Sequence, residues 1–332
     1  MNNNIILAMT KDIELYKCVL DNFKYHGQEC TYIEVPISDK KAKKLQSPLF
    51  KLKLFYKTKI ERKEKYIKRY TNLFSKEDIL KQIDEISEQS NKCLMIRPDV
   101  YPIEVVQKLN KLIPNTIGYQ WDGLDRFPKI HEYIPIFKKF LIYDKNDLKK
   151  YDNCSLTTNF YFDCYINENK TNPEYDVYYI GSYDNRINDV IELCEKLHNL
   201  KLKLKILIYC SKKNREKIEK YPFITVLRSG LTYKENLKNV FNCKTILDFG
   251  HKTLHNGLSL RPFEALGYHK KLITTNTSIN QYDFFNKKNI MIYKDEIDEI
   301  KIKDFIHSSY QNIEETVYKK YSFNVWFDNN LN

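Results

Sequence analysis

Glycine is scarce in this sequence, with 8 among 332 residues, and several sequence patterns are missing altogether. The spacing G-x-G-x-x-G, whose backbone amides hold a dinucleotide pyrophosphate, does not occur, which argues against a nicotinamide-dependent enzyme of the Rossmann type. No D-x-D sequence occurs either, so we expect neither a dedicated divalent metal site nor a cofactor.

The 8 cysteines form no C-x-x-C pair, and the histidines show no zinc-like spacing. Reduced thiols in a cytosolic core explain them best. No apolar run approaches the ~20 residues that cross a bilayer. The first apolar stretch spans only Ile5 to Met9 and has no basic leader, so we expect no signal peptide and a cytoplasmic location.

The net charge of +12 points to an anionic partner: nucleic acid, a membrane surface or a phosphate-bearing small molecule. Residues 40–70 hold 13 Lys or Arg and two Glu, interleaved with Leu, Phe, Tyr and Ile. We expect a basic helical insertion over 40–90, of which residues 40–70 could lie on anionic headgroups at the inner face of the cytoplasmic membrane. A solvated helical insertion is the alternative.

Short β-like runs alternate with helical patterns along the chain. This alternation predicts an α/β protein with parallel sheets covered on both faces. The polar stretch 167–174 separates two such blocks, so we expect two Rossmann-like domains facing a cleft. The predicted strands are 4–9, 30–35, 92–99, 115–122, 138–144, 175–182, 204–210, 224–230, 244–250, 270–276 and 290–293, and the predicted helices are 12–26, 102–113, 188–197, 233–241 and 262–267.

Polar residues follow many of these strands, at the edge where parallel sheets bind ligands. A Gly-Ser turn at Gly181 and Ser182 could meet a diphosphate through its backbone amides. Glu264 could accept the hydroxyls of a ribose, while Arg261 could contact phosphate oxygens. A helix-capping carboxylate and a surface cation are the alternatives for this pair.

The segment "GLSLRPFEALGYHKKLITT" resembles the C-terminal half of glycosyltransferases with the GT-B fold, of the spore-maturation and lipopolysaccharide-biosynthesis type. Ser259, Arg261 and the run from Phe263 to Leu266 match that pattern. Residues 117–152 ("WDGLDRFP"), 178–186 ("YYIGSYDNR") and the final "YSFNVWFDNNL" resemble further segments of the same family, in the same order.

The resemblance implies an acceptor-binding domain over 1–166, a nucleotide-sugar-binding domain over 167–315 and a C-terminal helix over 316–332 that crosses back to the first domain. The implied activity is metal-independent transfer of a sugar to a surface glycan, either lipopolysaccharide or capsule. Retaining members carry a second Glu eight positions before the one at 264, where this chain has Asn256. Retention or inversion is therefore not decided.

The candidate site residues fall into three groups. If the enzyme inverts, Asp122 is the candidate base, with capping of the next turn as its alternative role. The candidate donor-binding residues are Gly181, Ser182, Arg186, Arg228, His255, Asn256, Ser259, Arg261, Phe263, Glu264 and Asn276. The candidate acceptor-binding residues are Arg97, Asp99, Asp125 and Arg126.

Two other functions compete with the transferase. A non-catalytic relative that binds sugar or nucleotide is compatible with Asn256, where retaining enzymes have a carboxylate. A nucleic-acid-binding protein is compatible with the net charge, although no reader module is recognisable and no nucleic acid is expected as a partner. The expected partners are a nucleotide-sugar donor and a glycan or lipid-linked glycan acceptor.

Overall fold

The structure is a computed structural model that describes residues 4–36, 48–56, 74–169, 172–250, 257–294 and 298–331. The chain divides into two compact units. The first comprises Met1–Lys11, Gln28–Gln120 and Pro128–Leu141, and the second comprises Asp12–Gly27, Trp121–Phe127 and Ile142–Asn332. Candidate residues His255 and Asn256, and most of the basic segment 40–70, lie outside the described residues.

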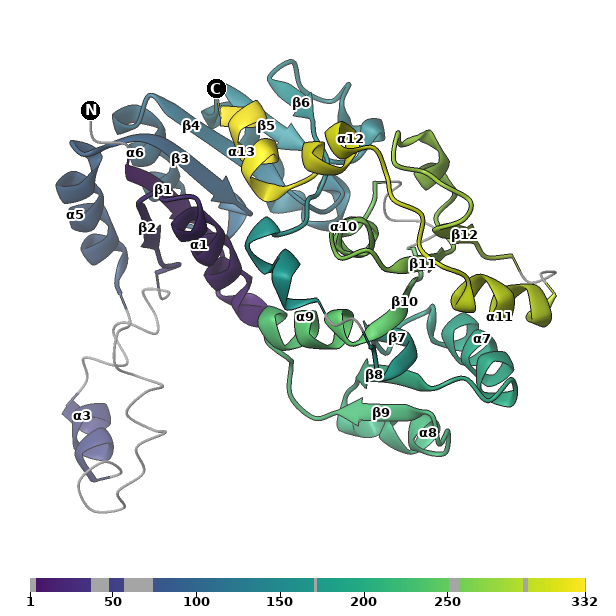
Figure 1. The fold of residues 1–332 in the computed structure, drawn as a ribbon. Helices are drawn as coiled ribbons and strands as arrows, with labels where there is room; N and C mark the ends of the chain where they lie inside the picture. Colours follow the sequence, from purple (N-terminus) through teal and green to yellow (C-terminus); the bar gives the residue numbers. More distant parts are fainter. Residues whose placement is uncertain are drawn as a thin grey trace. The chain divides into compact units, whose positions relative to one another are not determined.

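The first sheet has six strands in the order β2-β1-β3-β4-β5-β6 (Figure 1). The pairs β1–β2, β1–β3 and β3–β4 are parallel. Apolar side chains of the inner strands are almost completely buried, as parallel strands covered on both faces require. The strands are β1 Asn4–Ala8, β2 Cys30–Ile33, β3 Ser90–Ile96, β4 Asn115–Gln120, β5 Lys139–Ile142 and β6 Cys154–Leu156.

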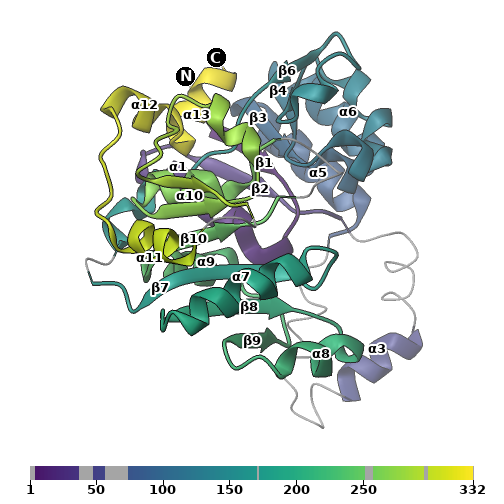
Figure 2. The same ribbon diagram turned by 90° about the vertical axis from the view of Figure 1, so that its right-hand side faces the viewer.

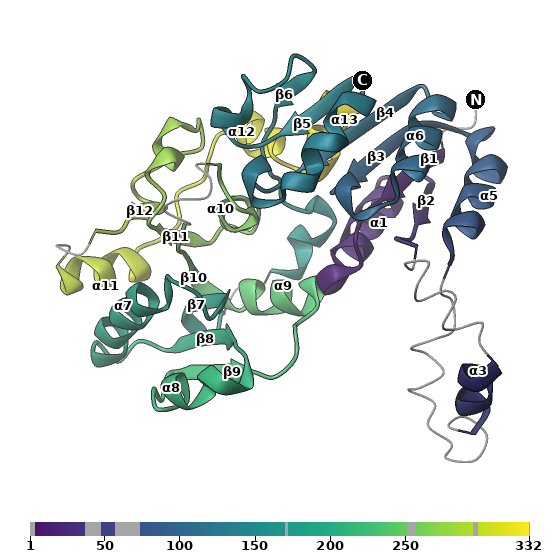
Figure 3. The ribbon, with the colours of Figure 1, turned by 180° about the vertical axis from the view of Figure 1, so that it is seen from behind.

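Two helices, α5 (Lys76–Ser87) and α6 (Ile103–Leu112), pack against each other and against β3 and β4 respectively (Figure 3). Helix α5 begins with a capping box, in which Ser75 and Asp78 satisfy each other's backbone amides. A separate short helix, α3, spans Pro48–Phe55. No described helix is long and apolar enough to span a membrane.

The second sheet also has six strands, in the order β12-β11-β10-β7-β8-β9, and every neighbouring pair is parallel. The order reverses between β7 and β10, which is where doubly wound sheets bind their ligands. The strands are β7 Tyr175–Ser182, β8 Leu204–Tyr209, β9 Ile224–Leu227, β10 Cys243–Asp248, β11 Lys271–Thr274 and β12 Ile290–Ile292.

Helices cover both faces of this second sheet (Figures 1 and 2). Helices α7 (Ile187–Asn199) and α11 (Glu299–His307) share an apolar core with alternate residues of β7, β8 and β10. On the other face, α9 (Tyr233–Phe241) contacts β7 and β10, and α10 (Leu260–Gly267) contacts β10 and β11. The short helix α8 (Arg215–Glu219) packs on β9.

An aromatic cluster joins the end of the chain to helix α1 (Leu15–Tyr25). The Phe23 ring lies 5.1 Å from Phe323 and 4.8 Å from Phe327, both on α13 (Phe323–Leu331). The Trp326 ring, 4.6 Å from Phe160, donates its indole N–H to Thr157 Oγ1 at 2.8 Å. This cluster fixes α13, and α12 (Glu315–Lys320) precedes it.

The predicted α/β alternation is confirmed by these two sheets. All five predicted helices are present, and α9 has the bounds that were predicted. Helices α5, α8 and α11 were not predicted as separate elements. The strand predicted over 92–99 ends earlier, at Ile96, because Arg97 adopts a left-handed backbone conformation with φ of 58°.

Candidate functional site

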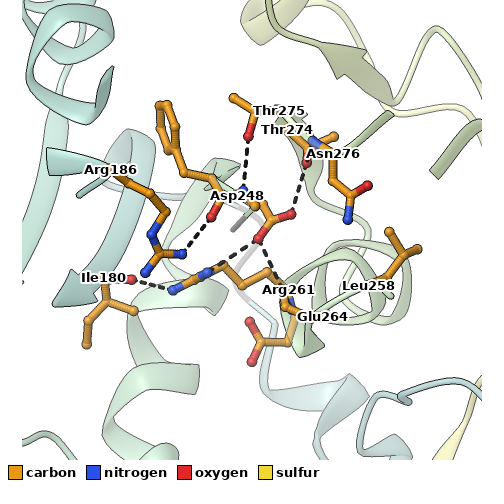
Figure 4. A network of polar contacts seen from close by, with 12 residues as sticks. Ile180, Arg186, Asp248, Leu258, Arg261, Glu264, Thr274, Thr275 and Asn276 are labelled. Atoms are coloured by element: carbon orange, nitrogen blue, oxygen red, sulfur yellow. Dashed lines mark hydrogen bonds and ion pairs between the residues drawn. The ribbon is translucent and has the colours of Figure 1, made fainter. Parts of the chain in front are cut away.

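The buried carboxylate of Asp248, at the carboxyl end of β10, organises the polar residues of the second unit (Figure 4). Its Oδ1 accepts hydrogen bonds from Ser259 Oγ at 3.1 Å and Arg261 Nη1 at 3.3 Å, and its Oδ2 accepts one from Thr274 Oγ1 at 2.9 Å. Asp248 is 3% exposed, and these partners compensate the burial of its charge. It thereby connects β10 with β11 and with the first turn of α10.

Arg261 is held from a second side as well. Its Nη2 donates to the backbone oxygen of Ile180 at 2.5 Å, and its guanidinium carbon lies 5.4 Å from the centre of the Tyr179 ring. The bonds to Asp248 and to Ile180 use two of the five N–H donors of the guanidinium. The side chain is 23% exposed. Arg261 is therefore rigidly placed and retains donors for a ligand.

The N-terminus of α10 is capped by Ser259, whose Oγ accepts the backbone N–H of Arg261 at 3.3 Å. Asn276 lies nearby, where its Nδ2 donates to the backbone oxygen of Gly257 at 3.3 Å. These bonds connect the end of β11 with the loop that leads into the helix. Ser259 and Asn276 both line the same pocket.

This pocket has a volume of about 550 Å³ and is called the phosphate lobe, after the group that we propose for it below. Four candidate arginine and carboxylate side chains, Asp122, Arg126, Arg186 and Arg261, line it together with the strand ends. Its lining includes Ile13, Trp121, Asp122, Arg126, Tyr143, Ile180, Gly181, Ser182, Arg186, Tyr209, Leu227, Leu231, Asp248, Gly250, Gly257, Ser259, Arg261 and Asn276. All of these residues belong to the second unit.

Glu264 lines an adjoining, smaller pocket of about 280 Å³, called the ribose lobe after the group that we propose for it below. It shares Ile13, Ile180, Leu231, Ser259 and Arg261 with the phosphate lobe. Glu264 Oε1 accepts hydrogen bonds from the Tyr233 hydroxyl at 2.5 Å and from Asn236 Nδ2 at 3.5 Å. Its Oε2 has no hydrogen-bond partner in the part of the chain that the structure describes. One carboxylate oxygen is thus available to a ligand.

Burial raises the pKa of Glu264, and the Tyr233 hydrogen bond and the Arg261 charge oppose this shift only in part. The carboxyl is 3% exposed. A buried carboxyl that lines a pocket and is only half satisfied is typical of a ligand-binding group, since burial without a ligand costs free energy.

Arg186 and Gly181 both line the phosphate lobe, and each has contacts within the chain that could not be predicted from the sequence. The guanidinium of Arg186 forms a two-pronged ion pair with Asp184, at 3.0 and 2.5 Å, and donates Nη1 to the backbone oxygen of Phe249 at 2.7 Å. A Cβ at Gly181 would lie 2.4 Å from the Tyr179 hydroxyl. A larger residue at 181 would therefore have to displace the Tyr179 ring. The turn predicted at Gly181 and Ser182 is wrong, because both residues belong to β7 and pair with Ile208 and Tyr209 of β8.

Asp122 and Arg126 both line the phosphate lobe and pair with each other, with Arg126 Nη1 2.6 Å from Asp122 Oδ1. The cap of the following turn is Gly123, so Asp122 does not have the capping role considered as its alternative. The Asp122 side chain is 17% exposed.

Several other candidates lie away from both lobes. Arg97 and Asp99 form a two-pronged ion pair at 2.8 and 2.7 Å in the first unit. Asp125 is exposed and pairs with Lys150. Arg228 is exposed and lines neither lobe. Phe263 is fully buried against Tyr282, Phe284 and Tyr321, so its side chain supports α10 and does not line a lobe.

Asp248, Tyr233 and Asn236 are site residues that were not predicted from the sequence. The polar end of the run "TILDFG" could have indicated Asp248, because it follows four residues of a buried strand. Tyr233 and Asn236 lie on a predicted helix, but no local pattern showed that this helix meets Glu264. Among the described residues, no group of three or more His, Cys, Asp or Glu could hold a metal ion.

Solved structures of low sequence identity share this arrangement. An α-glucosyltransferase in complex with UDP and a 13-mer DNA containing an HMU base superposes with a TM-score of 0.55 at 12% identity, covering 99% of this chain and 93% of that one. HepE from Anabaena in complex with UDP gives 0.55 at 8% identity, covering 98% of both chains. The chain has the GT-B glycosyltransferase fold.

The predicted fold class, α/β with two Rossmann-like domains, is thereby confirmed. The GT-B fold is not confined to transferases. The UDP-N-acetylglucosamine 2-epimerase from Rickettsia bellii matches with a TM-score of 0.50 at 11% identity, covering 99% of this chain and 95% of that one. No protein-family model and no curated protein matches this GT-B chain by sequence.

Replacing Glu264 by glutamine tests the cost of its burial. An acid whose pKa is raised by folding lowers stability at pH values above that raised pKa, and this cost disappears below the usual value of 4.5. We therefore expect Glu264→Gln to unfold at a higher temperature than the wild type at about pH 8, and the difference to shrink as the pH falls toward 4.5. Thermal unfolding followed by circular dichroism across this range measures the effect.

The control is Glu192→Gln, which changes a carboxylate that is 56% exposed and paired with Lys196. It should show no such gain at high pH. A difference between Glu264→Gln and the wild type that is independent of pH would contradict the assigned burial cost.

Proposed function

We propose that the chain is a glycosyltransferase that moves a sugar from a nucleotide-sugar donor to a glycan acceptor. The observation that carries the proposal is the half-satisfied, buried Glu264 carboxylate next to the fixed Arg261 guanidinium, at the strand ends of a GT-B fold. A carboxylate accepts the hydroxyls of a ribose, and an arginine contacts the diphosphate that follows it.

The donor is proposed to occupy both lobes. Its ribose lies against Glu264 Oε2 in the ribose lobe, and its diphosphate lies in the phosphate lobe near Arg261 and the backbone amide of Ser182, at the end of β7. The capped N-terminus of α10 adds its partial positive charge on the same side. In this proposal, arginine, backbone amides and the helix N-terminus stabilise the leaving diphosphate without a metal ion.

For an inverting transfer, Asp122 is proposed as the general base. The acceptor hydroxyl oxygen attacks the anomeric carbon, the bond from that carbon to the diphosphate oxygen breaks, and the hydroxyl proton passes to Asp122. Asp122 lines the phosphate lobe, which supports the assignment. Its pairing with Arg126 keeps the carboxylate oriented along the wall of the lobe.

The acceptor is proposed to be a surface glycan such as lipopolysaccharide or capsule, modified at the cytoplasmic side of the membrane. A nucleic acid is the competing acceptor, since the net charge is +12 and one structural neighbour was solved with DNA. The site itself favours the glycan, because its cations are paired: Arg126 with Asp122, Arg186 with Asp184 and Arg261 with Asp248. Phosphate binding by nucleic acid requires many uncompensated cations.

A peripheral membrane contact is proposed for the basic segment 40–70. Within it, α3 presents Leu49, Leu52 and Phe55 with exposed fractions of 84%, 70% and 58%. Exposed apolar side chains within a strongly basic segment are the combination that binds anionic bilayers.

Donor binding is expected to stabilise the protein against heat. In a panel of UDP-, GDP-, dTDP-, ADP- and CMP-linked sugars, one nucleotide class should stabilise the wild type by ~2.7 kcal/mol at ~100 times its Kd. Glu264→Ala should weaken that class by about 10- to 100-fold, because a hydrogen bond to a charged group contributes ~1.5–3 kcal/mol. Glu192→Ala is the matched control and should bind like the wild type.

If no nucleotide stabilises the wild type, the proposal fails. Conversion of the donor sugar without release of nucleotide would instead indicate an epimerase, the activity named for the Rickettsia protein.

Asp122→Asn is expected to abolish turnover while donor binding persists. Loss of a general base typically lowers the rate by about 10²- to 10⁴-fold. Release of nucleoside diphosphate in the presence of acceptor measures the rate, and the thermal shift measures donor binding. Asp152→Asn, at an exposed position in the same unit, is the control. Wild-type turnover in Asp122→Asn would exclude Asp122 as the base.

Membrane binding is expected to depend on α3. The protein should sediment with vesicles that contain phosphatidylglycerol and not with pure phosphatidylcholine, and added salt should release it. The combined variant Leu49→Ser, Leu52→Ser and Phe55→Ser should bind more weakly. The control Ile300→Ser removes an apolar side chain that is 64% exposed on α11 and should bind normally. Equal binding of both variants would refute a role for α3.

A further inference from the structure

A third pocket in the second unit, called the side pocket below, has a volume of about 540 Å³. It lies next to the phosphate lobe, because Tyr143 and Gly257 line both. Four short segments form most of it: residues 143–146, residues 156–158, residues 278–283 that follow β11, and residues 320–321 at the end of α12. This pocket was not predicted from the sequence, and the proposed donor does not occupy it.

The lining of the side pocket has the chemistry of a sugar site. Hydroxyl and amide side chains predominate, and each can both donate and accept hydrogen bonds, as sugar hydroxyls do. The tyrosine rings add flat apolar faces on which the C–H face of a pyranose can rest. Representative lining residues are Asn146, Thr158, Ser278, Gln281 and Tyr282.

The charges in the side pocket largely cancel. Asp283 accepts from Lys320 Nζ at 2.6 Å and from the Tyr321 hydroxyl at 2.5 Å, one bond on each carboxylate oxygen. Burial alone would raise the pKa of Asp283, but these two hydrogen bonds outweigh it and lower the pKa. Lys145 is the one lining cation without an acidic partner among the described residues. The pocket therefore fits a neutral ligand better than a polyanion.

The wall between the side pocket and the phosphate lobe is closely packed. A Cβ at Gly257 would lie 2.3 Å from the Tyr143 ring, so glycine at this position lets the backbone lie directly on that ring. The Gly257 oxygen accepts from Asn276, and the neighbouring Leu258 oxygen accepts from Asn159 Nδ2 at 2.9 Å. These bonds hold the wall in place before any ligand arrives, which lowers the entropic cost of binding.

We propose that the side pocket binds a neutral mono- or disaccharide unit of the acceptor and directs its hydroxyl across Tyr143 and Gly257 into the phosphate lobe. This rests on the proposed transferase function and extends it, because it places the acceptor sugar on residues 143–146, 156–158, 278–283 and 320–321. The candidate acceptor residues Arg97 and Asp99, which pair with each other in the first unit, are not part of this pocket.

Saturation-transfer NMR on the full chain tests the proposal. The probes are glucose, galactose, mannose, N-acetylglucosamine, rhamnose, lactose, maltose and chitobiose. At least one should receive saturation from the wild type. Tyr282→Ala should raise its Kd about tenfold, as expected for loss of an aromatic contact with its hydrogen bond. Gln281→Ala, at an exposed position, should raise the Kd severalfold without risk to the fold.

The matched controls are Tyr25→Ala, whose ring is 60% exposed on α1, and Gln107→Ala, at an exposed position on α6. Both should bind the sugar like the wild type. The stabilising nucleotide sugar from the donor panel is measured on every variant and should bind all of them equally, because Gln281 and Tyr282 do not line the donor lobes.

Each result separates the two proposals. If a nucleotide binds but no sugar does, or if Tyr282→Ala and Gln281→Ala bind sugar normally, the side-pocket proposal is overturned and the donor site stands. If a sugar binds in a way that depends on Gln281 and Tyr282 while no nucleotide binds, the pocket stands and the transferase fails. If these variants weaken binding of a fluorescent 13-base-pair DNA duplex and no sugar binds, the ligand is a nucleic acid and the proposal is wrong.

Discussion

The Asp248 carboxylate is the constraint on which the site depends. It lies at the end of a central strand with almost no solvent contact, and a buried charge must be fully compensated. Ser259, Arg261 and Thr274 supply that compensation, each from a different element or loop. The start of α10 is thereby fixed against the sheet, and Arg261 lines both the phosphate lobe and the ribose lobe.

The same pairing of charges distinguishes the site from the chain as a whole. The net charge is +12, yet each arginine at the phosphate lobe has a carboxylate partner. Glu264 is the exception, a carboxylate kept buried by a phenol and an amide with one oxygen left over. Proteins retain a buried carboxylate with an unpaired oxygen mainly where a ligand offsets its free-energy cost. Glu264 is therefore stronger evidence for a ligand site than the net charge of the chain.

Adjacent residues of α10 show how far sequence reasoning could reach. Arg261, Phe263 and Glu264 belong to one short match, and the resemblance assigned all three to the donor. The structure directs Glu264 toward Tyr233 and Asn236, and Phe263 toward Phe284 and other aromatic rings. Both side chains are buried, as are all residues of the helix from Pro262 to Gly267, so apolar periodicity could not tell a pocket wall from core.

Local patterns were enough to predict the alternating strands and helices, the two sheets and the polar strand ends, because burial on both faces of a parallel sheet requires apolar runs that end in loops. Contacts between residues far apart in the sequence could not be predicted from these local patterns. Asp248 contacts Arg261, 13 positions away in the sequence, and Thr274, 26 positions away. Glu264 contacts Tyr233, 31 positions away. Only the tertiary structure decided these contacts, since they depend on which helix faces which strand. These contacts in turn determine which polar residues are compensated and which remain open to a ligand.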